Sequence, residues 1–197
     1  MKDKKTYIIA VGTIFFFLIF VLTLAHAVWY SSGGEVPSDK ERDKVVTLAA
    51  SPLGDPTHLI IPALSIDAKI QKVGITRNGK MATPNNFTDV GWYKYGPAPG
   101  ALGSAVIAGH VDDGLAWPAV FADLDKLKEG DDVYVQMDSG SVHYKVTDFS
   151  VYDYDADASA VFEENRAHYL RLITCTGTWL PAYRTHNERL VVTAVEV

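Results

Sequence analysis

The longest hydrophobic run of the chain lies near its N-terminus, from about Ile8 to Trp29. At about 1.5 Å per residue, a helix of this length crosses the ~30 Å hydrocarbon core of a bilayer. Lys2, Lys4 and Lys5 precede the run, and positively charged flanks stay on the cytoplasmic side of a membrane. We therefore expect residues 1–30 to form a cytoplasmic tip and a transmembrane anchor, with the rest of the chain outside the cell.

A cleaved signal peptide is the alternative interpretation of this segment. Ala25-His26-Ala27 resembles an A-x-A cleavage site behind a positively charged start. The apolar run is longer than the ~7–15 residues usual for the core of a signal peptide, which favours the anchor. Both interpretations export the domain that follows.

After the anchor the pattern changes to polar residues and turn formers. Ser31-Ser32-Gly33-Gly34 is followed by a charged run from Asp39 to Lys44. This composition is typical of a linker, which we place at residues 31–56. One globular domain is then expected over residues 57–197.

Within that domain, apolar and polar residues alternate with the period of a β-strand. Val133, Val135 and Met137 would share one face of a strand, and Val142–Val146 continues the alternation after a turn at residues 138–140. Further strands are predicted at Leu59–Ile61, Ala68–Val73, Ser104–His110, Tyr169–Cys175 and Arg189–Val195, and short helices at Trp117–Lys128 and Ala158–Ala167. Many short strands separated by turns predict a closed or sandwiched all-β domain.

The charge of the exported part limits the kinds of molecule that we expect it to bind. The chain has 18 basic and 24 acidic residues, and removing the cytoplasmic Lys2, Asp3, Lys4 and Lys5 leaves 15 and 23 outside the membrane. An exported domain with this acidic excess disfavours nucleic acid and anionic lipid as partners.

Cys175 is the single cysteine of the chain, so it has no disulfide partner within it. It closes one predicted strand, His110 closes another, and Arg189 opens the last. A sheet can present residues at strand ends along one rim, where loops form a cleft. A thiolate nucleophile, an imidazolium acid and a guanidinium that stabilises an oxyanion are the groups that acyl transfer needs.

The motifs around these residues resemble those of the sortase family, the cysteine transpeptidases of Gram-positive cell surfaces. The family's T-L-x-T-C signature is matched by Arg171-Leu172-Ile173-Thr174-Cys175, with Arg171 in place of the first threonine. Ala108-Gly109-His110 matches the segment that carries the family's histidine. Glu188-Arg189-Leu190 matches the arginine at the start of the last strand.

This resemblance implies an eight-stranded β-barrel with His110, Cys175 and Arg189 as catalytic residues. It also implies cleavage of an LPxTG-like sorting signal between Thr and Gly through a thioester on Cys175. The acyl group would pass to an amine of a cell-wall precursor or a pilin, or more slowly to water. Thr174, Trp179 and Ala108 are expected to contribute to substrate binding.

No cofactor is expected, although some sortases bind calcium near the loop before the cysteine strand. The Asp153–Asp157 run with Glu164 superficially fits an EF-hand loop, but Ala158 stands where that loop needs glycine, and a predicted strand precedes it. His110, Asp112, His143, His168 and His186 show no close metal-ligand spacing, so no metal site is predicted.

Two other classes of protein remain as alternatives. One is an L,D-transpeptidase, whose Ser-His-Gly-Cys motif is not matched by the Leu-Ile-Thr that precedes Cys175. The other is a non-catalytic surface binding module with Cys175 as a core thiol. Within the sortases, Asp55-Pro56 is followed by Thr57 instead of an aromatic residue, which favours the class D, E or F groups over lid-bearing pilin polymerases.

Overall fold

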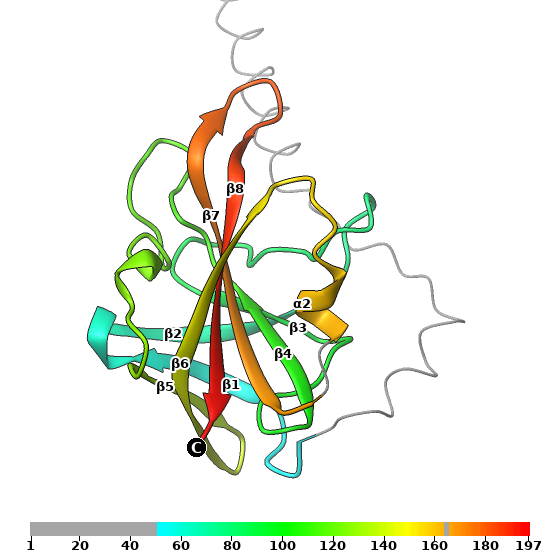
Figure 1. The fold of residues 1–197 in the computed structure, drawn as a ribbon, viewed down its shortest axis with the longest axis vertical. Helices are drawn as coiled ribbons and strands as arrows, with labels where there is room; N and C mark the ends of the chain where they lie inside the picture. The colour runs from blue at the N-terminus through cyan, green and yellow to red at the C-terminus, as the bar shows by residue number, and fades with distance from the viewer. Residues whose placement is uncertain (1–50, 164–165) are drawn as a thin grey trace, which may run out of the picture. The chain divides into compact units, whose positions relative to one another are not determined.

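The computed structural model describes residues 51–163 and 166–197 (Figure 1). These residues form a closed β-barrel in which β1 is followed around the wall by β2, β3, β4, β7, β8, β6 and β5. The strands are β1 (Pro56–Ile61), β2 (Ile66–Val73), β3 (Val90–Tyr93), β4 (Gly103–Ala108), β5 (Asp132–Met137), β6 (Gly140–Asp153), β7 (His168–Leu180) and β8 (Thr185–Glu196). The helical pieces are short: η2 (Pro62–Leu64), η3 (Leu124–Lys126) and α2 (Ser159–Glu163). The predicted all-β barrel is confirmed.

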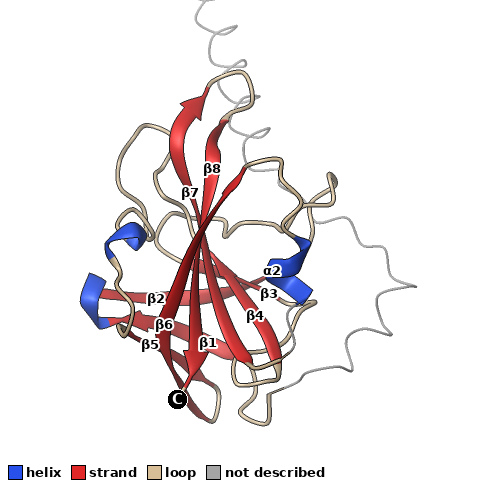
Figure 2. Ribbon diagram, in the orientation of Figure 1, coloured by secondary structure: helices blue, strands red, loops and turns tan. Residues whose placement is uncertain are grey.

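Two strand pairs are parallel, and they determine where the long loops run. β2 pairs with β3, and β4 with β7, in parallel, whereas the other neighbours are antiparallel (Figure 2). Because parallel neighbours need a crossover, the chain between β4 and β7 travels through β5, β6 and α2 before it returns beside β4. Segments about 65 residues apart, such as Ala108 and Ile173, thereby become direct neighbours.

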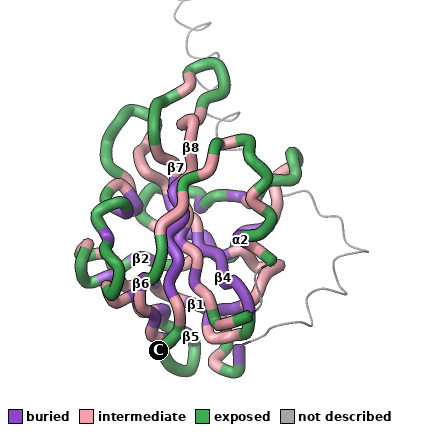
Figure 3. The backbone as a smooth tube through the Cα atoms, in the orientation of Figure 1, coloured by how far each residue is buried: buried purple, intermediate pink, exposed green. Residues whose placement is uncertain are grey.

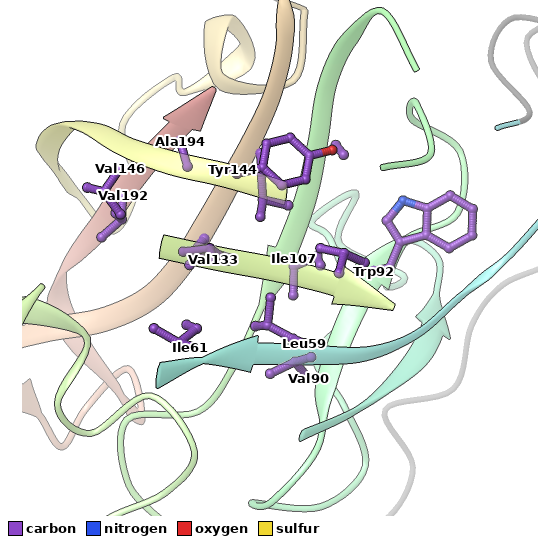
Figure 4. Packing of buried hydrophobic residues seen from close by; sticks show 14 of the residues in the cluster. Leu59, Ile61, Val90, Trp92, Ile107, Val133, Tyr144, Val146, Val192 and Ala194 are labelled. Carbon is purple, nitrogen blue, oxygen red and sulfur yellow. The ribbon is translucent and has the colours of Figure 1, made fainter. Parts of the chain in front are cut away.

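The barrel interior is filled by the alternating apolar positions of the strands (Figure 3). Val133 and Val135 are fully buried, and so is Tyr144 on the adjacent strand (Figure 4). Burying a tyrosine requires a partner for its hydroxyl, and the Gly100 N–H donates to it at 2.7 Å. The hairpin predicted from this alternation is confirmed, with Val135 opposite Val142.

The helix predicted over Trp117–Lys128 is wrong for most of its length. Only η3 is helical, within turns closed by bonds between residues three apart, such as Leu124 N–H to the Phe121 carbonyl. Phe121, Leu124 and Leu127 are all buried, and their spacing of three suits the three residues per turn of a 3₁₀ turn better than an α-helix.

Other boundaries also differ from the sequence prediction. The second predicted helix, Ala158–Ala167, contains the five-residue α2. β3 was not predicted because its four residues, Val-Gly-Trp-Tyr, show no alternation: the first three are all buried. The strand expected to end at His110 ends at Ala108, so Gly109 and His110 begin the loop.

The predicted anchor over residues 1–30 and most of the linker lie outside the described residues. Within residues 51–163 and 166–197, no helix has the length and apolar character needed to cross a membrane.

Candidate active site

Cys175 and Arg189 lie directly opposite each other on β7 and β8, the antiparallel pair at the centre of the candidate site. Both residues are partly buried. The ladder is regular up to Thr176 and Glu188, and then the register shifts before Trp179 meets His186. At this irregularity Gly177 has φ +78°, and a Cβ there would lie 2.3 Å from Asn187 Oδ1. The β-bulge therefore begins two residues after Cys175, at a place that favours glycine.

His110 reaches the same region from the end of β4. The β4–β7 register pairs Ala108 with Ile173, so a continuation by two residues brings His110 level with Cys175. Two hydrogen bonds hold this position: Gly109 N–H donates to the Ile173 carbonyl at 3.0 Å, and the Thr174 hydroxyl donates to the Gly109 carbonyl at 3.0 Å. The segments that carry His110 and Cys175 are thus joined by one backbone hydrogen bond and by the hydrogen bond of a buried hydroxyl.

The His110 ring has its own contacts in the loop before β3. Its Nε2 lies 3.1 Å from the Pro84 carbonyl, and its ring centroid is 5.2 Å from that of Phe87. The His110 carbonyl also accepts a hydrogen bond from Phe121 N–H at 2.9 Å. Because a carbonyl oxygen only accepts, Nε2 is the donor in this contact, and Nδ1 is the ring nitrogen that remains for another partner.

The Arg189 guanidinium is held by three hydrogen bonds within its own segment. Nη1 donates to the carbonyls of His186 at 3.0 Å and Glu188 at 2.8 Å, and Nη2 donates to the Thr185 hydroxyl at 2.7 Å. Since a guanidinium has five N–H donors, this arrangement fixes the planar group and leaves donors for a ligand.

Burial raises the pKa of the Cys175 thiol above its ordinary value, and the negative charge of Asp112 adds to this effect. The Arg189 charge acts in the opposite direction and lowers the Cys175 pKa, as do hydrogen bonds from the Thr185 hydroxyl and the His186 backbone N–H. The neutral thiol is therefore the main form near neutral pH, and the reactive thiolate is the minor one.

Sequence reasoning gave no role at this site to Asp112, Thr185 or His186, and it considered Asp112 and His186 only as metal ligands. His186 Nε2 lies 3.3 Å from Asp112 Oδ2, and the two side chains are only 14% and 23% exposed. The pair links the loop after His110 to the start of β8. Asp112 follows His110 by two residues, and His186 precedes Arg189 by three. These spacings indicate that Asp112 and His186 lie close together only once His110 and Arg189 are known to do so.

The three predicted substrate-binding residues have different surroundings. Thr174 is 4% exposed and its hydroxyl is used by the Gly109 carbonyl, so its structural role is to position the end of β4. Trp179 is 42% exposed and packs edge-on against His186, with ring centroids 5.3 Å apart. Ala108 is partly buried and lies opposite Gly91 of β3. Their contact with substrate stays a prediction.

The described loops around the site contain no arrangement typical of a metal centre. No group of three or more His, Cys, Asp or Glu side chains in the described part of the chain is placed to hold an ion. β6 extends through Asp153, so a strand and not a helix leads into the acidic run that resembled an EF-hand loop.

Comparison with known proteins shows the family of this chain. The model of the sortase domain family matches residues 59–197. The chain belongs to the sortase family. Among curated proteins, no sequence matches it.

Several solved sortases share the fold. Sortase C-1 of Actinomyces oris aligns with a TM-score of 0.59 at 22% identity, over 85% of each chain. Sortase C1 of Streptococcus agalactiae has a TM-score of 0.59 at 24% identity, over 82% of this chain and 77% of that one. The Pilus Island 1 sortase C2 of Group B Streptococcus has a TM-score of 0.57 at 25% identity, over 89% and 94%. The likeness to these structures concerns the fold.

Proposed function

We propose that this sortase is a cysteine transpeptidase that cleaves an LPxTG-like sorting signal and transfers the acyl group to an amine. The observation that carries the proposal is the meeting of three motifs: Cys175 lies opposite Arg189, and the β4–β7 register brings His110 level with them. A thiol, an imidazole and a fixed guanidinium at one rim are the groups that acyl transfer requires.

In the proposed first step, the Cys175 thiolate attacks the carbonyl carbon of the threonine in the signal. The carbon–nitrogen bond to glycine breaks, and the His110 imidazolium gives its proton to the leaving nitrogen. The peptide is then held as a thioester on Cys175. In the second step an amine attacks this thioester, His110 takes the amine proton, and Cys175 leaves as the thiolate.

Arg189 is proposed to stabilise the oxyanion of both tetrahedral intermediates or to fix the substrate backbone. Its three internal hydrogen bonds hold the guanidinium in place before substrate arrives. Preorganised donors of this kind cost little reorganisation when charge develops on the carbonyl oxygen.

The proposed partners follow from this chemistry. They are surface proteins that bear a C-terminal sorting signal, and an amine of a cell-wall precursor or pilin. The cellular location is proposed as the cell membrane, with one span over residues 1–30 and the barrel outside. The class D, E or F assignment is also retained as a proposal, since Thr57 follows Asp55-Pro56 where a lid motif has an aromatic residue.

Intact mass spectrometry of the detergent-solubilised full chain, incubated with a pool of LPxTG-like peptides, tests the function. We expect a mass increase equal to the N-terminal fragment of the preferred peptide, which hydroxylamine removes. Cys175→Ala should show no adduct, and His110→Ala should nearly lose it.

Two other outcomes distinguish the remaining classes. No adduct together with ready alkylation of Cys175 would indicate a thiol enzyme with another substrate, such as the peptidoglycan stem of an L,D-transpeptidase. A thiol that gives no adduct and also resists alkylation in the folded protein would support the non-catalytic binding module.

A further inference from the structure

His186 lies near the start of β8 and connects two parts of the candidate site. Its side chain pairs with Asp112 in the loop after β4, and its backbone carbonyl accepts a hydrogen bond from Arg189 Nη1 at 3.0 Å. We propose that Asp112 and His186 are positioning residues that hold the Arg189 guanidinium in place for the reaction. The inference rests on the proposed function and assigns to it two residues outside the three family motifs.

The ladder between β7 and β8 is interrupted just before it reaches His186. The regular register ends at Thr176 opposite Glu188 and resumes, shifted, at Trp179 opposite His186. A β-bulge disrupts the ladder locally, so the hydrogen bonds of the sheet constrain this segment less than the rest of β8. The backbone that holds the guanidinium therefore depends on contacts made by side chains.

Asp112 is held in its loop by two contacts of its own. Its backbone forms an isolated bridge with Pro118, and its Oδ1 accepts a hydrogen bond from Gly114 N–H at 2.8 Å. The other carboxylate oxygen, Oδ2, lies 3.3 Å from His186 Nε2. Because the loop already holds the backbone and one oxygen, the carboxylate is oriented toward His186 before substrate binds.

The His186 ring contacts Trp179 as well as Asp112. The centroids of the two rings are 5.3 Å apart in an edge-on arrangement. The His186 and Asp112 side chains are only 14% and 23% exposed, so water and salt screen this pair less than they screen an ion pair on the surface. Residue 186 is thus held to the loop that begins with Gly109 and His110.

The pair acts on the reaction through Arg189. Nη1 of the guanidinium donates to the carbonyls of His186 and Glu188, so a shift of the backbone at residue 186 would displace the guanidinium or break one of these hydrogen bonds. A misplacement of about 1 Å at a catalytic group can cost about 10²-fold in rate. Because Arg189 is proposed to act on charge that develops in the transition state, losing the pair should lower kcat more than it raises KM.

The test compares His186→Phe, which keeps a ring for Trp179 without the nitrogen, with His186→Gln, which keeps an N–H donor. In peptide turnover by the detergent-solubilised full chain, we expect His186→Phe to lower kcat about tenfold and His186→Gln to stay within about threefold of the wild type. In an Arg189→Ala background, His186→Phe should lower kcat by no more than about twofold, because the guanidinium that the pair positions is absent.

Glu196→Gln is the matched control. Glu196 pairs with His168 at 3.2 Å near the opposite end of the β7–β8 ladder, so this variant removes a pair of the same type away from Arg189. Its kcat should equal that of the wild type. A general effect of histidine–carboxylate pairs on the hairpin would instead lower kcat in both variants.

The rate at which phenylglyoxal modifies Arg189, mapped by mass spectrometry, is a measurement that needs no peptide. We expect this rate to rise about threefold in His186→Phe, because the guanidinium is held less firmly, and to stay unchanged in Glu196→Gln. If the wild type processes no peptide, the proposed function fails, but the modification rate still decides whether the pair positions Arg189.

Asp112→Ala is the second variant that removes the pair, and a thermal melt confirms that each variant is folded. An unchanged modification rate of Arg189 in a folded His186→Phe or Asp112→Ala protein would overturn the proposal. An equal fold loss of kcat with and without Arg189 would overturn it too, since the pair would then act independently of the guanidinium.

Discussion

The β5–β6 hairpin and the β7–β8 hairpin are built from similar strands but end in different ways. β5 and β6 pair without a shift from Asp132 opposite Lys145 to Met137 opposite Gly140, and their inward side chains are buried. β7 and β8 are equally regular up to Thr176 and Glu188, one pair beyond Cys175 and Arg189, and then the register shifts. Figure 1 shows that the tip of this second hairpin extends beyond β4.

The forces that hold the two hairpins differ as well. The first hairpin combines buried apolar side chains with ion pairs of Asp132 to Lys145 and His143 along a regular ladder, whereas polar contacts hold the shifted part of the second. Asn187 Oδ1 accepts from Thr178 N–H, Arg189 donates to Thr185, and His186 pairs with Asp112. β-bulges are over-represented beside active sites, where they re-aim side chains or end the strand pairing.

Replacing Arg189, in the β7–β8 hairpin, should give the largest loss of activity. Arg189→Ala is expected to lower transpeptidation by at least about 10²-fold, because the oxyanion loses a preorganised cation. Steady-state kinetics with the preferred peptide measures this loss. Arg184→Ala is the matched control: Arg184 is exposed in the turn between β7 and β8, and its removal should be mild. If Arg184→Ala lost as much activity as Arg189→Ala, Arg189 would not be the one cation on which transpeptidation depends.

Gly109→Ala should affect the barrel and the site together. A Cβ at Gly109 would lie 2.5 Å from Phe121 Cδ2, and the Phe121 side chain is fully buried. We expect a loss of about 1–3 kcal/mol in the free energy of unfolding, with a fall in turnover because His110 is the next residue. Chemical denaturation and peptide kinetics measure the two effects.

Gly79→Ala is the control for this variant, since Gly79 has φ +76° and nothing within 4 Å of an added Cβ. It introduces backbone strain without a steric clash, so turnover should stay at the wild-type level. Full activity in a Gly109→Ala protein that is measurably less stable would show that the position of His110 does not depend on this packing.

Tyr144→Phe should give the smallest effect and leave activity unchanged. The substitution removes the acceptor for Gly100 N–H at 2.7 Å, which costs about 1 kcal/mol in the free energy of unfolding. Burial raises the pKa of Tyr144 above its ordinary value, so the neutral hydroxyl persists and this loss should not depend on pH in the ordinary working range. Chemical denaturation at two pH values tests whether the loss of stability is independent of pH. A loss of turnover in Tyr144→Phe would contradict the expectation that this buried residue acts on stability alone.

The local pattern of apolar residues and short motifs was enough to predict the β5–β6 hairpin and the family. The alternation at Val133–Met137 and Val142–Val146 specified a hairpin because side chains of a strand point to opposite faces in turn. The Leu-x-Thr-Cys, Ala-Gly-His and Glu-Arg-Leu motifs were sufficient to indicate the sortase family. The short β3 and the 3₁₀ turn at η3 were not predicted, since their few residues carry no period distinguishable from that of other buried segments.

The tertiary structure alone decided which residues surround the thiol. Asp112, Thr185 and His186 are 63, 10 and 11 positions from Cys175 in the numbering, and only the parallel β4–β7 pairing and the shifted β7–β8 register bring them to it. The same holds for the Cys175 pKa, which depends on burial and on charges from two elements. A sequence specifies periodicity and residue type through local physics, but the electrostatic environment of one atom is a sum over neighbours that only the closed barrel defines.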